Sequence, residues 1–399
     1  MSTRIGTANA YATAIANLSA RQSDLVSLQD NLTSQKRITR ASDDPTAAAR
    51  AERDRTRMAR IASDQTALDS QKATMTTAES TLGDVTSALQ SFRELVVNAG
   101  SGTLTDSDRA SLAQQMASLR DEIFSYANKQ DSNGVPLFGG LGSIGTPFSN
   151  TGTVQFQGLG GQRTGSDTSV SPTIDGQAAF LNVPTGNGVF TVATGAANTG
   201  TASADAGVVT SPTAVTGHPY TIAFAVDATT GATTYTVTDT TLATTTAPAA
   251  YTPGSAIAFD GISINVSGTP KDTDTLAIAP STRSDLFASM DQAIASVKSA
   301  TSTAGTLPTQ IAQSLSQLDA GLARISSARG YAGDVLNQVD RISDAQTGLS
   351  NQLEADRSSA EDLDMIKAVS DFTNKQTVYS AALSSYAQIQ KLSLFNFIS

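Results

Sequence analysis

Few residues of this chain have the types and spacing that catalysis or cofactor binding requires. The 399 residues include no cysteine and one histidine, His218. That composition excludes a thiolate metal site and a cysteine nucleophile, and leaves little room for a histidine base. Gly140, Gly142 and Gly145 match the G-x-G-x-x-G pattern, but Thr-Pro-Phe follows, where a nucleotide site needs a helix. We therefore expect no enzyme activity, no catalytic residue, no cofactor and no metal.

Two groups of charged residues could either bind a ligand or have only a structural role. Four arginines fall on one predicted helix face: Arg50, Arg53, Arg57 and Arg60. They could bind phosphates, but Glu52 and Asp54 interleave with them, so we favour a solvated or subunit-facing ionic stripe. The pair Asp272 and Asp274 could begin a cation loop, although a β-turn is the better interpretation.

The strongest pattern is an apolar stripe at each end of the chain. Apolar residues recur there at steps of three and four, the spacing that a coiled coil buries. The last eight residues add an apolar tip, which would be unfavourable in water and is therefore predicted to be an interface. The predicted assembly interface comprises Tyr11, Ile15, Leu18, Leu25, Leu32, Phe372, Tyr379, Leu383, Tyr386, Ile389, Leu394, Phe395 and Phe397.

The charges beside these stripes are complementary. Residues 21–60 carry nine basic and six acidic side chains, whereas residues 350–371 carry six acidic and two basic. We expect the two terminal helices to pack on each other. Charge would set their register and the apolar stripe would supply the affinity, because exposed ion pairs contribute only about 0.2–1 kcal/mol each.

Helical periodicity continues inward from both ends. The apolar stripes within 78–126 and 286–325, beginning with Ala78, Leu82 and Val85, predict the core of a helical bundle. Asp44 before Pro45 predicts a helix start, and residues 98–102 predict its glycine-rich end. Thr105 and Asp108 predict a capping box for the next helix. Helices are also predicted from 286 to 297 and from 311 onward, the latter continuing past Gly330 and Gly333 into the C-terminal helix.

The middle of the chain has a different composition. Residues 141–280 hold 10 of the 62 charged residues but 18 of the 30 glycines. Alternating runs within 210–280 predict a small antiparallel β domain. Residues 141–210 are compatible either with strands and long loops or with partial mobility.

These patterns predict a mainly α protein with an inserted β domain, in which the N- and C-terminal segments form a long helical bundle or coiled coil. The predicted divisions are a terminal coiled-coil assembly segment (1–40 and 355–399), a helical bundle core (41–140 and 281–354) and a surface-exposed, Thr/Gly-rich, mainly β insertion (141–280). A net charge of −10 and a pI near 4.6 argue against nucleic acid as a partner. Without an apolar run near 18 residues we expect no membrane partner.

Five segments together resemble the family of hook-associated protein 3, which are hook–filament junction proteins of the flagellin superfamily. They are residues 32–48 (with Lys-Arg-Ile-Thr-Arg-Ala-Ser-Asp-Asp-Pro), 93–105, 131–140, 259–270 and 379–398. The chain departs from the family at Gln35, where a glycine usually precedes the Lys-Arg pair, and this concerns the local loop conformation.

The resemblance implies a structural protein of the bacterial flagellum. Its implied partners are its own copies in the flagellar axis, the first hook-associated protein, flagellin and a cytosolic export chaperone. It also implies an extracellular location at the hook–filament junction, reached by type III export without a cleaved signal peptide. Flagellin or another axial protein is the nearest alternative, and an enzyme with a helical stalk is a distant third.

Overall fold

The computed structural model describes residues 2–143, 145–299 and 306–398, and the side chains of residues 9, 11–143, 145–299 and 306–388. The chain forms two compact units. One unit comprises Met1–Thr66 with Ser343–Ser399, and the other comprises Ala67–Ile342. The boundary falls inside two long helices, so each unit contains part of both.

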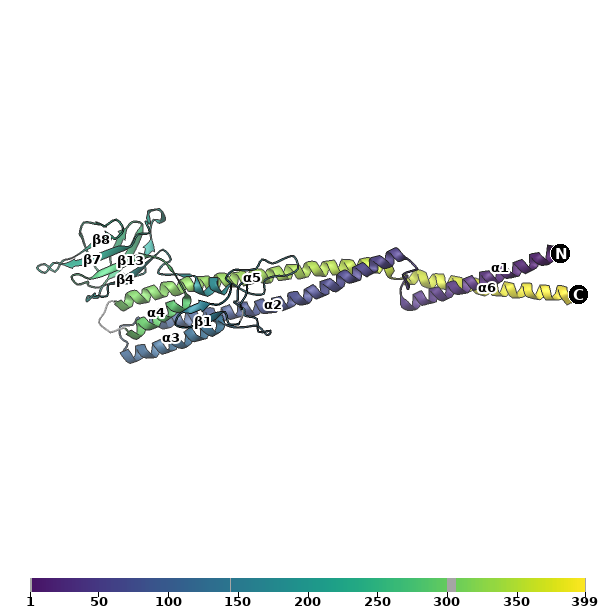
Figure 1. Cartoon of the computed structure of the whole chain (residues 1–399), viewed down its shortest axis with the longest axis horizontal. Coiled ribbons are helices and arrows are strands. Elements are labelled where there is room, and N and C mark those ends of the chain that lie inside the picture. Colours follow the sequence, from purple (N-terminus) through teal and green to yellow (C-terminus); the bar gives the residue numbers. More distant parts are fainter. Residues whose placement is uncertain (1, 144, 300–305, 399) are drawn as a thin grey trace. The chain divides into compact units, whose positions relative to one another are not determined.

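Six α-helices account for most of the residues that the structure describes (Figure 1). They are α1 (Ser2–Ser34), α2 (Pro45–Ala99), α3 (Asp106–Ala127), α4 (Leu286–Ser299), α5 (Thr306–Glu361) and α6 (Met365–Ile398). The predicted caps are confirmed. Asp44 Oδ1 accepts the Ala47 N–H at 3.1 Å at the start of α2, and Thr105 and Asp108 form a reciprocal capping box on α3.

One helical prediction was incomplete. α5 does run through Gly330 and Gly333, as expected, but it ends at Glu361, and α6 begins separately at Met365. Asp364 marks the new start, because its Oδ1 accepts the Lys367 N–H at 3.1 Å. The C-terminal helix is therefore a distinct element joined to α5 by a short connection.

The larger unit is built around an apolar core shared by α2, α3, α4 and α5. Periodicity identified most of it correctly, since the fully buried side chains on the helices include Leu82, Leu89, Phe92, Met116, Ile123, Met290 and Leu318. Arg120 crosses from α3 to α4, where its guanidinium pairs with Asp291 at 3.0 Å and lies 5.4 Å from the centre of the Phe287 ring.

Residues 137–183 complete this helical core. Phe138, Phe148 and Phe180 are buried in it, and Phe180 stacks on Phe287 of α4 at 6.1 Å between ring centres. The segment contains the short hairpin β1 (Phe148–Asn150) and β2 (Val154–Phe156), one turn of π-helix η1 (Gln177–Leu181) and β3 (Val183–Pro184). From the sequence, residues 141–183 were assigned to the insertion because they carry few charges. In the structure the aromatic side chains of this segment pack with the helices.

A separate β body follows, with its own apolar core. The larger sheet has the order β10-β8-β7-β13-β4, with β9 paired to β8, and the smaller has the order β11-β12-β5, with β6 paired to β12. The strands of the larger sheet are β4 (Phe190–Thr194), β7 (Tyr220–Val226), β8 (Thr233–Asp239), β9 (Thr244–Thr245), β10 (Ala249–Ala250) and β13 (Thr275–Pro280). The smaller sheet contains β5 (Ser203–Ala204), β6 (Val208–Val209), β11 (Ala256–Phe259) and β12 (Ile262–Ser267), and a 3₁₀ turn, η2 (Pro212–Ala214), precedes β7.

The alternation seen in the sequence explains the packing of this body. In β12 the side chains of Ile262, Ile264 and Val266 are buried and those between them are more exposed, as expected for a sheet with one covered face. The chain enters and leaves the body side by side, because β3 pairs antiparallel with β14 (Arg283–Ser284). The neck of the insertion is therefore at 183–184 and 283–284.

Candidate assembly interface

The smaller unit contains the paired terminal helices. α1 and α6 run antiparallel, side by side (Figure 1). The Tyr11 and Tyr386 rings meet edge to face at 6.2 Å, and Lys375 Nζ lies 3.4 Å from Asp24 Oδ2. Each contact joins one residue of α1 to one residue of α6, and both contacts fit the same antiparallel register. Together they fix how the two helices align.

The seam between α1 and α6 is only partly covered. The half-buried members of the predicted interface are Tyr11, Leu18, Leu25, Leu32, Phe372, Tyr379 and Tyr386. Ile15 and Leu383, which were predicted with them, are 51% and 43% exposed and lie outside the seam. The side chains of Ile389, Leu394, Phe395 and Phe397 fall outside the described residues.

Three seam residues were missed by the sequence interpretation. Ala14, Leu28 and Ala382 are half-buried, and Ala14 and Ala382 directly precede the exposed Ile15 and Leu383. Periodicity alone could not decide between these neighbouring positions, since a step of three and a step of four both lie close to the helical repeat. The predicted and observed sets on α1 share Tyr11, Leu18, Leu25 and Leu32 and differ at the positions between them.

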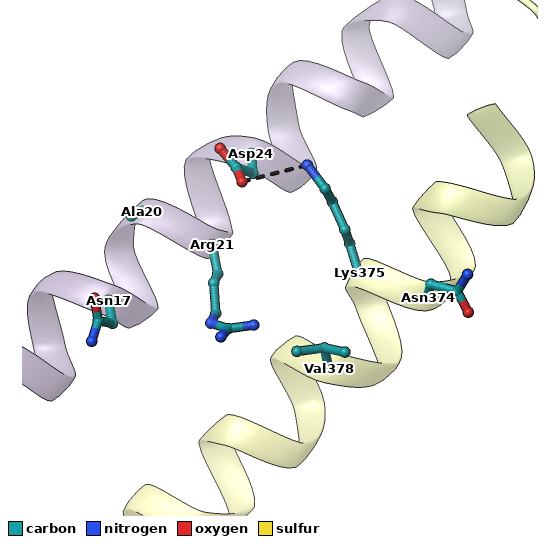
Figure 2. A pocket seen from close by; sticks show the side chains of 7 residues that line it. All are labelled: Asn17, Ala20, Arg21, Asp24, Asn374, Lys375 and Val378. Carbon is teal, nitrogen blue, oxygen red and sulfur yellow. Dashed lines mark hydrogen bonds and ion pairs between the residues drawn. The ribbon is translucent and has the colours of Figure 1, made fainter. Parts of the chain in front are cut away.

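A shallow groove lies along the seam. It encloses about 450 Å³ and is lined by Asn17, Ala20, Arg21, Asp24, Asn374, Lys375 and Val378. Figure 2 shows Arg21 extending from α1 toward α6, and Lys375 reaching back to Asp24. One ion pair, amides and a single valine do not form a nucleophile–base arrangement, so the groove is a helix–helix surface rather than a catalytic centre.

The loop between α1 and α2 is bound to the connection between α5 and α6. Arg37 N–H donates to the Glu361 carbonyl at 2.7 Å, and Leu363 N–H donates to the Gln35 carbonyl at 3.0 Å. Arg37 Nη2 also donates to the Ala360 carbonyl at 2.6 Å. These bonds make the two connections a short two-stranded joint.

Gln35 has the unusual backbone conformation that this joint requires. Its φ is +58°, in the left-handed region that favours glycine. The glycine usual in the resembling family at this position is therefore explained by the backbone, and this chain adopts the same turn with a glutamine.

Glu361 is the charged centre of the joint. Its side chain is 7% exposed and lies 3.2 Å from Lys36 Nζ and 2.6 Å from Arg55 Nη2, with Arg357 one helical turn before it also paired to it. Burial favours the neutral acid, but Arg55 and Lys36 outweigh it, so the pKa of Glu361 lies below its usual value. The charge asymmetry of the two ends hinted at such pairing without identifying these residues.

The Asp-Asp-Pro motif closes the same loop. Asp43 Oδ2 accepts the N–H groups of Thr39 at 3.2 Å and Arg40 at 2.8 Å, and Asp44 caps α2. The backbone N–H donors lower the pKa of both carboxyl groups below the usual range. Each residue of the motif thus has a local structural role.

Other candidate chemistry is accounted for by structure. His218 Nδ1 lies 2.7 Å from Asp239 Oδ2 in the β body, and Asp274 accepts three backbone N–H groups, from Thr199, Gly200 and Lys271. The four arginines of the α2 stripe are all exposed. Within the described ranges, no group of three or more His, Asp or Glu side chains is arranged to hold a metal ion. None of the described helices combines the length and hydropathy needed to cross a membrane.

Comparison with known proteins defines the class. The N-terminal helical region of bacterial flagellin matches residues 5–143, and its C-terminal helical region matches residues 315–398. These ranges contain most of α1, all of α2, α3 and α6, and most of α5. The chain belongs to the flagellin superfamily.

Within that superfamily, the chain is similar to hook-associated protein 3. It is 30% identical to that protein from Salmonella typhimurium over 187 residues, which is 47% of this chain and 56% of the relative. It thus spans about half the length of the curated relatives it matches. The crystal structure of the flagellar junction protein FlgL from Legionella pneumophila matches with a TM-score of 0.67 and 29% identity, covering 72% of this chain and 98% of that one. A flagellin from Shigella flexneri is 29% identical but is covered over only 36% of its length.

Proposed function

We propose that this chain is a structural subunit of the bacterial flagellar axis at the junction between hook and filament. The observation that carries the proposal is the incomplete coverage of the paired terminal helices. Ile366 is 88% exposed, and Val26 and Val369 are each 52% exposed. Apolar side chains in such number on one helix pair favour further helices packing against them.

The proposed partners follow from the relatives. Copies of this chain would pack with each other, with another hook-associated protein on the hook side and with flagellin on the filament side. The thirteen predicted interface residues would contribute to these contacts, those outside the α1–α6 seam chiefly to contacts between subunits. The three predicted divisions of the chain would correspond to axial attachment, helical support and an outer body.

The proposed route to this site is export as an unfolded chain through the flagellar type III channel, guarded in the cytosol by an export chaperone. The absence of cysteine supports this route, since no disulfide can obstruct threading. The proposal predicts a non-enzymatic, extracellular protein that is not cleaved at its N-terminus.

Deleting the gene in the source bacterium tests the proposed function. We expect hooks without filaments, and flagellin accumulating in the medium, with both defects reversed by a plasmid copy. Immunogold labelling of an epitope inserted in the β body should mark the hook–filament boundary. Label distributed along the whole filament would instead identify the chain as flagellin.

A further inference from the structure

The arginine face of α2, defined as Arg50, Arg53, Arg57 and Arg60, has no charged partner among the residues that the structure describes. All four side chains are exposed, and within the described residues none forms an ion pair. The one hydrogen bond they make is local, from Arg53 Nε to the Ala49 carbonyl at 3.2 Å. Glu52 pairs instead with Arg55 at 3.4 Å, and Asp54 is buried at 6% exposure.

This arrangement is unfavourable for a solitary helix. Successive arginines of the face are three or four positions apart, so like charges are neighbours, which costs a few tenths of a kcal/mol per pair. An acidic chain could easily place carboxylates among them. Arginine is also the cation most often used at protein interfaces, because its planar guanidinium binds a carboxylate with two hydrogen bonds and is weakly hydrated.

Acidic side chains without partners lie in the same compact unit. Asp356 on α5 and Asp371 on α6 are exposed, and neither forms an ion pair or hydrogen bond within the described residues. The other four acidic residues of 350–371 have partners within the chain: Glu354, Glu361 and Asp362 lie beside cations and Asp364 caps α6. The unit therefore carries four unpaired arginines on α2 and two unpaired aspartates on α5 and α6.

We propose that the arginine face binds Asp356 and Asp371 of neighbouring copies of this chain. The inference rests on the proposed function, which supplies the neighbouring copies. The four unpaired arginines and the two unpaired aspartates are of opposite charge, so the two sets are complementary across a contact between copies. A head-to-tail contact between two different surfaces also suits a helical array, in which every subunit uses both.

Charge reversal in the full chain tests this contact. The variant Arg53→Glu/Arg57→Glu, expressed in the gene-deletion strain, should be incorporated into purified hook–filament structures about tenfold less than the unsubstituted chain, because like charges would then face each other. Asp356→Arg/Asp371→Arg should show a similar loss. Combining all four substitutions in one chain should restore incorporation.

Matched controls separate this contact from folding and from the proposed function. Arg53→Lys/Arg57→Lys keeps the charge but loses the two-bond geometry, so it should be incorporated better than the glutamate variant and less well than the parent. All purified variants should keep the thermal unfolding temperature of the parent. Normal incorporation of the glutamate variant would overturn the inference. If the glutamate variant is incorporated poorly and the added aspartate reversal does not restore incorporation, the inference is also overturned, because another protein then occupies the arginine face. Absence of the unsubstituted chain from hook–filament structures would refute the proposed function instead.

Discussion

At the scale of single residues, the joint between the α1–α2 loop and the α5–α6 connection explains the sequence motif around it. Asp43, Asp44 and Pro45 close the loop and start a helix. Glu361 pairs with Lys36 of the α1–α2 loop, Arg55 of α2 and Arg357 of α5. Only Asp44 and Pro45 could be assigned from the sequence, because capping depends on neighbours. Two of the three cations paired with Glu361, Lys36 and Arg55, are more than 300 positions away, which no local pattern records.

Gln35 provides a test of the backbone at this joint. Replacing a non-glycine residue at positive φ with glycine removes about 1–2 kcal/mol of backbone strain. Glycine is also more flexible in the unfolded chain, and this offsets about half of that gain. We expect Gln35→Gly to raise the free energy of unfolding by up to about 1 kcal/mol in urea titrations. Gln35→Val should lower it, because a β-branched side chain tolerates this conformation least. Equal stability of the three chains would contradict the assigned turn.

Glu361 makes the stability of the joint dependent on pH. Its pKa is lower in the folded chain than its ordinary value of 4.5, so its contribution is complete above that value and is lost as the pH falls through the folded pKa. Glu361→Gln should cost about 1–3 kcal/mol near neutral pH. Thermal unfolding of parent and variant, followed from pH 7 downward, should converge in acid. A constant difference at all pH values would mean that the charge of Glu361 is not what stabilises the joint.

At the scale of secondary structure, the buried residues of a helix could be predicted where several other helices cover one of its faces. Ala78, Leu82 and Val85 were assigned to the core from spacing alone, and each is completely buried. The prediction of the residues in the α1–α6 seam was less accurate. A helix that contacts only one other helix buries a narrow strip of its surface, and the periodic pattern does not select between neighbouring positions beside that strip. Residues 141–183 were assigned by composition, which cannot reveal that Phe148 and Phe180 pack beneath helices.

The two kinds of position on α1 can be separated by substitution. Leu18→Asp introduces a carboxylate into the half-buried seam and should destabilise the α1–α6 pair by about 1–3 kcal/mol. Ile15→Asp changes an exposed side chain and should leave the isolated chain within about 0.5 kcal/mol of the parent. Hydrogen exchange of α1 and α6 amides measures both effects. Faster exchange in the Ile15 variant than in the Leu18 variant would show that the seam has been assigned to the wrong face.

At the scale of the whole molecule, the β body has its own core and is joined to the larger unit's helices by few polar contacts. Ala204 N–H donates to Thr309 Oγ1 of α5 at 2.8 Å, and Ser316 Oγ donates to the Gly186 carbonyl at 2.9 Å. The body enters and leaves through neighbouring strands, since Thr185 N–H donates to the Thr282 carbonyl at 2.9 Å. These features are typical of an insertion that a helical framework can lose.

Removal of the body should therefore leave a folded protein. Replacing residues 187–280 with a short Gly-Asn-Gly turn should preserve the helical circular dichroism and shift the helical unfolding temperature by only a few degrees, because the helical core retains Phe138, Phe148 and Phe180. Retaining residues 141–183 is essential. A matched deletion that begins at 141 should expose that core and lower the unfolding temperature much further. Similar behaviour of the two deletions would contradict the separate cores.

The central claim is that attachment to the axis depends on the terminal helices rather than on the β body. The most direct measurement is the fraction of total flagellin that is shed into the medium by the gene-deletion strain carrying each variant. The account predicts that the strain carrying Leu18→Asp/Leu25→Asp sheds most of its flagellin, although the variant is made and exported. The strain carrying the chain that lacks residues 187–280 should keep its filaments. Retention of filaments by the seam variant, together with shedding by the body-deletion variant, would contradict the account.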